Sequence, residues 1–209
     1  MRISEEERIA VLQSLGILDT PPEAIFDQVT RLAALIFKTP IAVISLVDTE
    51  RQWFKSCVGL DVCETGRDVA FCDHAIRGDD VLVVLDATQD PRFCDNPLVT
   101  GEPSIRFYAG APLLHSSGAR LGTLCIIDRH PRAAFGEDQR RQLAGMAEAI
   151  VSAMAMRLDI AALVRLETER ARQDSHLGQV ECLAGIGHGS WKPGTATLAW
   201  SPAVYAIHG

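Results

Sequence analysis

Apolar residues near the start of the chain recur at helical spacing. Ile9, Leu12 and Leu15 fall on one face of a predicted helix. Ser4 is followed three residues later by Glu7, a capping-box pattern that favours a helix start at this point. A second helix is predicted over residues 22–37, with Pro22 as its first residue. The apolar positions that keep its helical period are Ile25, Val29, Leu32, Ala33 and Ile36.

Residues 41–128 change to short apolar runs that are rich in β-branched side chains, which predicts strands. The predicted strands cover residues 41–48, 52–59, 81–88, 105–115 and 119–128. Turn signals join the first two and the last two, as in β-hairpins. Residues 67–76 predict a short helix, and residues 89–99, with Pro, Asp and Asn, predict a loop. This irregular mixture of helices with a mainly antiparallel sheet predicts an α+β fold.

The pattern changes again after Gly136, where one long helix is predicted. No Pro or Gly interrupts the chain between Gly145 and Gly178, and a helix of about 30 residues would be about 45 Å long. A small domain cannot bury a helix of that length, and residues 165–175 are polar with mixed charges, as in a solvated linker or a dimeric coiled coil. The recurring apolar positions are Leu143, Ala147, Ile150, Met154, Leu158 and Ala161.

Composition limits the classes of function. The chain has 209 residues, of which 47% are hydrophobic and 22% charged, so it can bury a core. A net charge of −7 disfavours a nucleic-acid surface and a polybasic membrane anchor. No apolar run reaches the roughly 18 residues of a transmembrane helix, and the first residues are acidic rather than signal-like. We therefore expect a cytoplasmic protein whose six cysteines are mostly reduced, with no nucleic-acid or membrane partner.

Six segments follow one another in a characteristic order along the chain. They are LGILDTPPEAIFDQVTRLAALIF, PIAVISLVDTERQWFKSCVGLD, FCDHAI, DATQDPRFCDNPLV, IRFYAGAPL and LGTLCIID. Together these segments resemble a known family, the GAF domains of bacterial sensor histidine kinases and diguanylate cyclases. The resemblance covers residues 2–157, followed by a helical linker over 158–177 and, over 178–209, a stretch similar to the truncated start of a PAS domain.

The resemblance implies a GAF-like central antiparallel sheet flanked by helices, with a long C-terminal helix. It further implies a sensory or regulatory domain that binds a small ligand or dimerises through its N- and C-terminal helices. The signal would pass along the long helix to PAS and output domains, most simply those of a histidine kinase. No kinase or cyclase motif occurs in this chain, so we expect no such catalysis from it. The alternative is a thiol-dependent reductase of free methionine sulfoxide, or a redox sensor.

Candidate ligand-binding residues come from three segments. Aromatic walls with a few converging polar groups are typical of small-ligand sites, although the same residues also suit a core or turn caps. The candidate pocket residues are Phe71, Cys72, His74, Asp86, Asp90, Phe93, Phe107 and Tyr108.

Cys72 and His74 leave several roles open: ordinary packing, a pocket wall or covalent attachment of a bilin. Asp73 separates the two residues, which departs from the adjacent Cys-His pattern of bilin-binding relatives. The cyclic-nucleotide signature NKFDE is absent, and so is any C-x-x-C pair for a metal. We therefore favour no cofactor over a bilin or a cyclic nucleotide, and expect no metal. Redox chemistry would involve the additional cysteines Cys57, Cys63 and Cys94.

Overall fold

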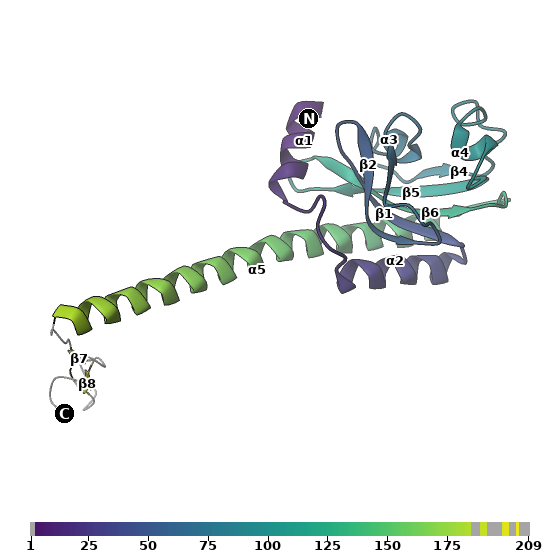
Figure 1. Ribbon diagram of the computed structural model, residues 1–209. Helices are drawn as coiled ribbons and strands as arrows, with labels where there is room; N and C mark the ends of the chain where they lie inside the picture. The colour runs from purple at the N-terminus through teal and green to yellow at the C-terminus, as the bar shows by residue number, and fades with distance from the viewer. Residues whose placement is uncertain (1–2, 185–188, 192–197, 201–203, 205–209) are drawn as a thin grey trace. The chain divides into compact units, whose positions relative to one another are not determined.

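The computed structural model describes residues 3–184, 189–191, 198–200 and 204, and the chain divides into two units, residues 1–156 and 157–209. The first unit contains a six-stranded sheet in the order β3-β2-β1-β6-β5-β4, in which all neighbouring strands are antiparallel (Figure 1). The strands are β1 (Ile41–Val47), β2 (Arg51–Val58), β3 (Glu64–Gly66), β4 (Leu82–Val84), β5 (Phe107–Leu114) and β6 (Arg120–Asp128). The α+β fold predicted from the sequence is confirmed.

Helices cover both faces of the sheet (Figure 1). One face carries α2 (Ala24–Phe37) and the first turns of α5 (Glu137–Ala184). Of the six apolar positions noted in the sequence of α5, four are buried (Leu143, Ala147, Ile150 and Met154), whereas Leu158 is half-buried and Ala161 is exposed. The other face carries the short helices α3 (Phe71–Ala75) and α4 (Pro97–Thr100). The N-terminal α1 (Glu5–Ser14) contacts β6.

The strand β1 pairs with β2 on one side and β6 on the other, and it is buried at all seven positions. Elements cover both faces of the sheet, which suits the nearly continuous apolar sequence of β1. Its neighbour β6 approaches closely at Gly122. A Cβ atom added at Gly122 would lie only 1.9 Å from the carbonyl oxygen of Ser45, where the β1–β2 pairing shifts register. A glycine is therefore required where these two backbones meet.

Helix α1 follows its sequence pattern closely. Ser4 Oγ accepts a hydrogen bond from the Glu7 backbone N–H at 3.2 Å, and the Ser4 N–H donates to Glu7 Oε2 at 2.7 Å. The predicted capping box is thus confirmed.

Helix α2 differs from its prediction in two respects. It begins at Ala24 rather than Pro22, because Glu23 at the N-cap still has extended backbone angles. The sheet buries Phe26, Thr30, Ala33 and Phe37, so only Ala33 of the apolar stripe noted in the sequence lies on the buried face. Ile25, Leu32, Leu35 and Ile36 are between 50% and 73% exposed.

Other boundaries also shift. The strand predicted over 81–88 is only Leu82–Val84, since residues 85–90 form a bend and a turn, and β3 had no prediction. Helix α5 has 48 residues, longer than the predicted 30 or so. No helix among the described residues is long and apolar enough to cross a membrane.

The second unit contains the C-terminal part of α5 and two short strands. Strands β7 (Gly189–Trp191) and β8 (Leu198–Trp200) pair antiparallel. Most of the predicted PAS segment, residues 178–209, lies outside the described residues, so that assignment stays a prediction.

Candidate functional site

Four of the predicted pocket residues meet in the core between α3 and the sheet. The rings of Phe71 and Phe93 stack with centroids 4.0 Å apart, and Tyr108 lies 5.1 Å from Phe71. Together with Cys72 they are nearly fully buried. The space that a ligand would need on this face of the sheet is occupied by the protein's own side chains.

The Tyr108 ring lies along its own strand. A Cβ atom at Gly110 would come within 2.2 Å of the Tyr108 hydroxyl oxygen, so Gly110 leaves the room that this hydroxyl occupies. The hydroxyl is thereby held over the sheet, 3.5 Å from Cys72 Sγ, to which it donates a hydrogen bond.

Cys72 is the polar centre of this cluster. Thr123 Oγ1 donates to Cys72 Sγ at 3.1 Å, and Cys125 Sγ lies 4.0 Å away. Hydrogen bonding with Cys125 lowers the pKa of Cys72 to about 6, with Thr123 and Tyr108 adding to this effect and burial opposing it. The same contact and burial raise the pKa of Cys125 well above its ordinary value. The pair therefore favours a single thiolate, located on Cys72.

His74 points away from Cys72. Both residues lie on α3, and positions two apart on a helix face different sides. The His74 ring meets the edge of Phe93 at 4.8 Å between centroids and borders a surface cavity. Burial lowers the pKa of His74, which favours the neutral imidazole. The two residues thus form no nucleophile and base pair.

Asp86 and Asp90 stabilise turns. Asp86 Oδ1 accepts hydrogen bonds from the Thr88 N–H at 3.0 Å and the Thr88 hydroxyl at 2.7 Å. Asp90 pairs with Arg92 at 2.5 Å, and this contact lowers the pKa of Asp90. Both carboxylates are engaged by residues two positions later, as in Asx-turns.

Phe107 is separated from the other predicted pocket residues by the sheet. Successive residues of a strand face opposite sides, so Phe107 points away from the side that Tyr108 faces. Its ring packs 5.6 Å from Phe135 and under the Arg132 guanidinium at 4.6 Å. The structure therefore groups Phe107 with the α2 and α5 side of the core.

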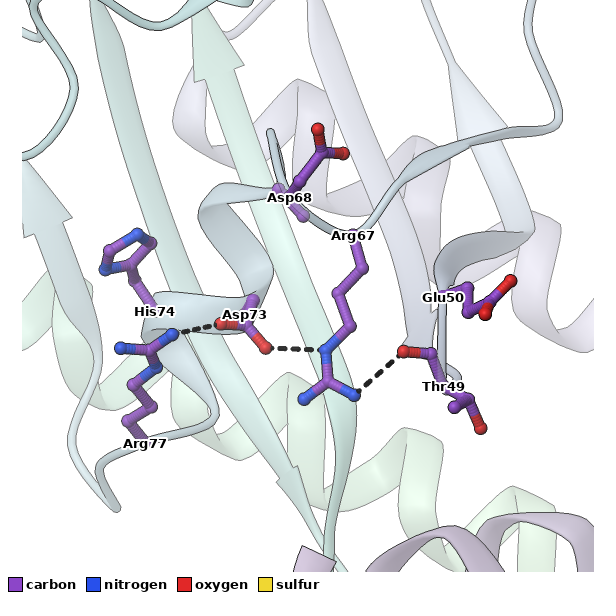
Figure 2. A pocket seen from close by; sticks show the side chains of 8 residues that line it. Thr49, Glu50, Arg67, Asp68, Asp73, His74 and Arg77 are labelled. Carbon is purple, nitrogen blue, oxygen red and sulfur yellow. Dashed lines mark hydrogen bonds and ion pairs between the residues drawn. The ribbon is translucent and has the colours of Figure 1, made fainter.

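A surface cavity of about 450 Å³ adjoins α3, and its polar lining was missed by the sequence analysis (Figure 2). Arg67 Nε donates to Asp73 Oδ1 at 2.7 Å, and its Nη1 donates to Glu5 Oε1 at 2.6 Å and to the Asp48 carbonyl at 3.0 Å. Arg77 binds the second Asp73 oxygen at 2.5 Å. The lining residues are Thr49, Glu50, Arg67, Asp68, Ala70, Asp73, His74 and Arg77.

This network lowers the pKa values of two carboxyl groups, those of Asp73 and Glu5. Burial opposes ionisation of Asp73, but Arg67 and Arg77 outweigh it and lower the pKa of Asp73. The hydrogen bond from Arg8 lowers the pKa of Glu5 to about 2, with Arg67 adding to the shift. No local spacing in the sequence relates Arg67 to Glu5, 62 residues away, so only the fold reveals the network.

The described residues include no group of three or more His, Cys, Asp or Glu side chains that could hold a metal ion. Cys57 and Cys94 are partly buried, Cys63 is exposed, and all are free thiols. Burial raises the pKa of Cys57, the opposite of what activates a thiol.

Comparisons with known proteins agree with this architecture. Over 133 residues the chain is 50% identical to the cyclic di-GMP phosphodiesterase PA2567 of Pseudomonas aeruginosa, a match that covers 64% of this chain and 23% of that protein. The chain thus spans less than a quarter of the curated relative's length.

Two solved structures share the fold at low sequence identity. The GAF domain of an Acinetobacter phosphoenolpyruvate-protein phosphotransferase has 16% identity and a TM-score of 0.55, covering 74% of this chain and 95% of that one. The free methionine-R-sulfoxide reductase of Neisseria meningitidis has 17% identity and a TM-score of 0.53, covering 74% and 94%. The GAF domain profile matches residues 21–154, which is more than half of the chain, and the chain therefore belongs to the GAF domain family.

Proposed function

We propose that this chain is a regulatory GAF domain of a bacterial signalling protein, and that its output is the turnover of cyclic di-GMP. The observation that carries the proposal is the 50% identity over 133 residues with a cyclic di-GMP phosphodiesterase. Because the match makes up only 23% of that protein, it fits a shared regulatory domain better than a shared catalytic one. A histidine kinase or diguanylate cyclase output, which the sequence resemblance implied, is the alternative.

A homodimer is part of this proposal. The outward stripe of α2 (Ile25, Leu32, Leu35 and Ile36) is an apolar helix face that a monomer leaves in water. Within α5, Met156, Ile160 and Leu163 are also exposed and lie at helical spacing. Two copies that bury these helix faces against each other would give α5 a partner, and α5 would then carry the signal towards a PAS or output domain.

The proposal also includes a ligand site and a cellular location. A small ligand would act at α3, either in the cavity beside His74 or by displacing the rings of Phe71 and Phe93. A cytoplasmic location suits the five free thiols of the described residues, since such thiols persist in reducing compartments.

The experiment that tests the proposal is a domain exchange. Residues 21–154 would replace the matching segment of the P. aeruginosa phosphodiesterase, and hydrolysis of cyclic di-GMP would be measured. We expect the chimera to keep activity within a few-fold of the parent enzyme, while deletion of the segment changes it by more than tenfold. A chimera whose activity equals that of the deletion would contradict the proposal.

The reductase alternative is tested separately with the chain alone. Its similarity to reductase structures is under 25% identity and reflects the fold. We expect no turnover of free methionine sulfoxide in the presence of a thiol donor. Turnover that Cys72→Ser or Cys94→Ser abolishes would favour the reductase.

A further inference from the structure

Two buried cysteines, 53 residues apart in sequence, face each other across the core. Cys72 on α3 is 4% exposed, Cys125 on β6 is 2% exposed, and their sulfur atoms lie 4.0 Å apart. A disulfide bond requires about 2.05 Å between the sulfurs, so the two atoms need to approach by roughly 2 Å. A shift of this size is available to a short helix such as α3, which has five residues and no side-chain hydrogen bond at its N-cap.

The surroundings of Cys72 suit a thiolate. The hydroxyl groups of Thr123 and Tyr108 both donate to its sulfur, at 3.1 and 3.5 Å. Hydrogen-bond donors that are fixed around a sulfur stabilise its negative charge, and the thiolate is the reactive form. Cys125, whose pKa is raised, remains protonated as its partner.

A small reactant has only a short distance to travel. Ala70, Asp73 and His74 line the surface cavity of about 450 Å³, and Cys72 lies between them on the inner side of the same helical turn. A single turn of α3 therefore separates the sulfur from solvent. Hydrogen peroxide is close to water in size and can pass where a larger oxidant cannot.

We propose that Cys72 and Cys125 form a hydroperoxide-oxidisable pair, in which Cys72 reacts first and Cys125 closes an intramolecular disulfide. Nothing in this chemistry depends on the proposed signalling output. Its consequence for the fold is local: the bond draws α3 towards β6 and moves the adjacent Asp73, the residue that Arg67 binds.

The reaction balances without a further reactant. Cys72 first releases its thiol proton to water, and the thiolate then attacks one peroxide oxygen. An S–O bond forms as the O–O bond breaks, and the leaving alkoxide or hydroxide takes up one proton from water, which balances the proton that Cys72 released. Cys125 then attacks the resulting sulfenic acid, an S–S bond forms as the S–O bond breaks, and the hydroxide leaves as water with the Cys125 proton. Two thiols are oxidised by two electrons, and one hydroperoxide is reduced to an alcohol or water.

The test is peptide mapping of the purified, reduced chain after treatment with hydrogen peroxide. Free thiols are then blocked with N-ethylmaleimide and the protein is digested with trypsin without reduction. The cleavage sites isolate the two cysteines, because residues 68–77 contain only Cys72 and residues 121–129 contain only Cys125. We expect one cross-linked species of these two peptides, lighter than their sum by two hydrogen atoms and absent after treatment with dithiothreitol.

Cysteine variants show which thiol is oxidised first and which one then forms the disulfide. In Cys125→Ala the 68–77 peptide is expected to accumulate a sulfenic acid that dimedone captures, and in Cys72→Ala neither species forms. Cys57→Ala is the matched control, since Cys57 and Cys125 both pair with Val43 from neighbouring strands, and it should keep the cross-link.

The wild-type map alone can overturn the proposal, even if a variant fails to fold. Oxidation of the 56–67 or 93–106 peptides, which hold Cys57, Cys63 and Cys94, while 68–77 stays fully alkylated would exclude Cys72 as the reacting thiol. A cross-link between 121–129 and 56–67 would assign the pair to Cys57 instead.

Discussion

Arg67 Nε lies 2.7 Å from Asp73 Oδ1, and this ion pair joins the segment after β3 to the short helix α3. Both side chains are largely shielded from solvent, at 22% and 13% exposed. Asp73 has a second partner in Arg77, whose side chain is 67% exposed. One carboxylate therefore has a shielded arginine on one side and a solvent-exposed arginine on the other, which allows a direct comparison of the two.

Arg67→Met is expected to lower the free energy of unfolding by roughly 2 kcal/mol, because hydrogen bonds to shielded charges contribute more than surface pairs. Arg77→Met removes the exposed partner of the same carboxylate and should lower it by less than about 1 kcal/mol. Urea unfolding of the two variants measures both values. Equal losses would show that shielding of Arg67 adds nothing.

Acid is expected to destabilise the N-terminal helix through Glu5. The folded-state pKa of Glu5 is about 2 against an ordinary value of 4.5, so its contribution is present above pH 4.5 and lost as the pH falls towards 2. Unfolding free energies at several pH values between these limits should fall less steeply in Glu5→Gln than in the wild type. Glu6→Gln, at the next position of α1 and also exposed, serves as the control and should keep the wild-type slope.

The same substitution at two glycines should have opposite effects. Gly122→Ala places a Cβ atom 1.9 Å from the Ser45 carbonyl and is expected to destabilise the fold by roughly 3 kcal/mol. Gly145→Ala, in α5 with nothing within 4 Å of the added atom, should stabilise it by about 0.5–1 kcal/mol. Thermal unfolding reports both signs, and a neutral Gly122→Ala would contradict the close strand contact.

The α2 stripe should control association. Leu32→Glu combined with Ile36→Glu is expected to halve the molar mass that light scattering measures at high protein concentration, because charges then replace the apolar contact. Leu114→Glu, at a residue of β5 with similar exposure, is the control and should leave the mass unchanged. A monomeric wild type at the same concentration would refute the dimer.

The sequence predicted the structure best where a local pattern was compatible with only one structure. The capping box at Ser4 and Glu7 predicted the start of α1 because both groups are local, and the apolar, β-branched run over residues 41–48 predicted the strand β1. In α2 two apolar stripes have the same helical spacing. One consists of Phe26, Ala33 and Phe37, and the other of Ile25, Leu32 and Ile36. Only the sheet decides which stripe is buried.

Prediction of the candidate site was limited in the same way, because it depends on contacts between distant parts of the chain. Phe71, Cys72 and Tyr108 were selected as residue types that suit a pocket, and the structure does bring them together. Phe107 was selected for the same reason, as an aromatic residue of the segment that holds Tyr108, but the alternation of strand residues places it on the other face. Cys125 and Arg67 escaped selection because their partners lie 53 and 62 positions away, and contacts at such separations leave no spacing signal.

The stacked rings of Phe71 and Phe93 occupy the space beneath α3, so any ligand that enters the core there must displace one of them. Swinging one ring into water costs roughly 1.5–3 kcal/mol, so the apparent affinity of such a ligand falls by roughly 10- to 150-fold relative to an open cavity. Natural ligands of this space would therefore need a flat apolar group that replaces the lost stacking. A strictly polar molecule would instead remain in the outer cavity, among Arg67, Asp73 and His74.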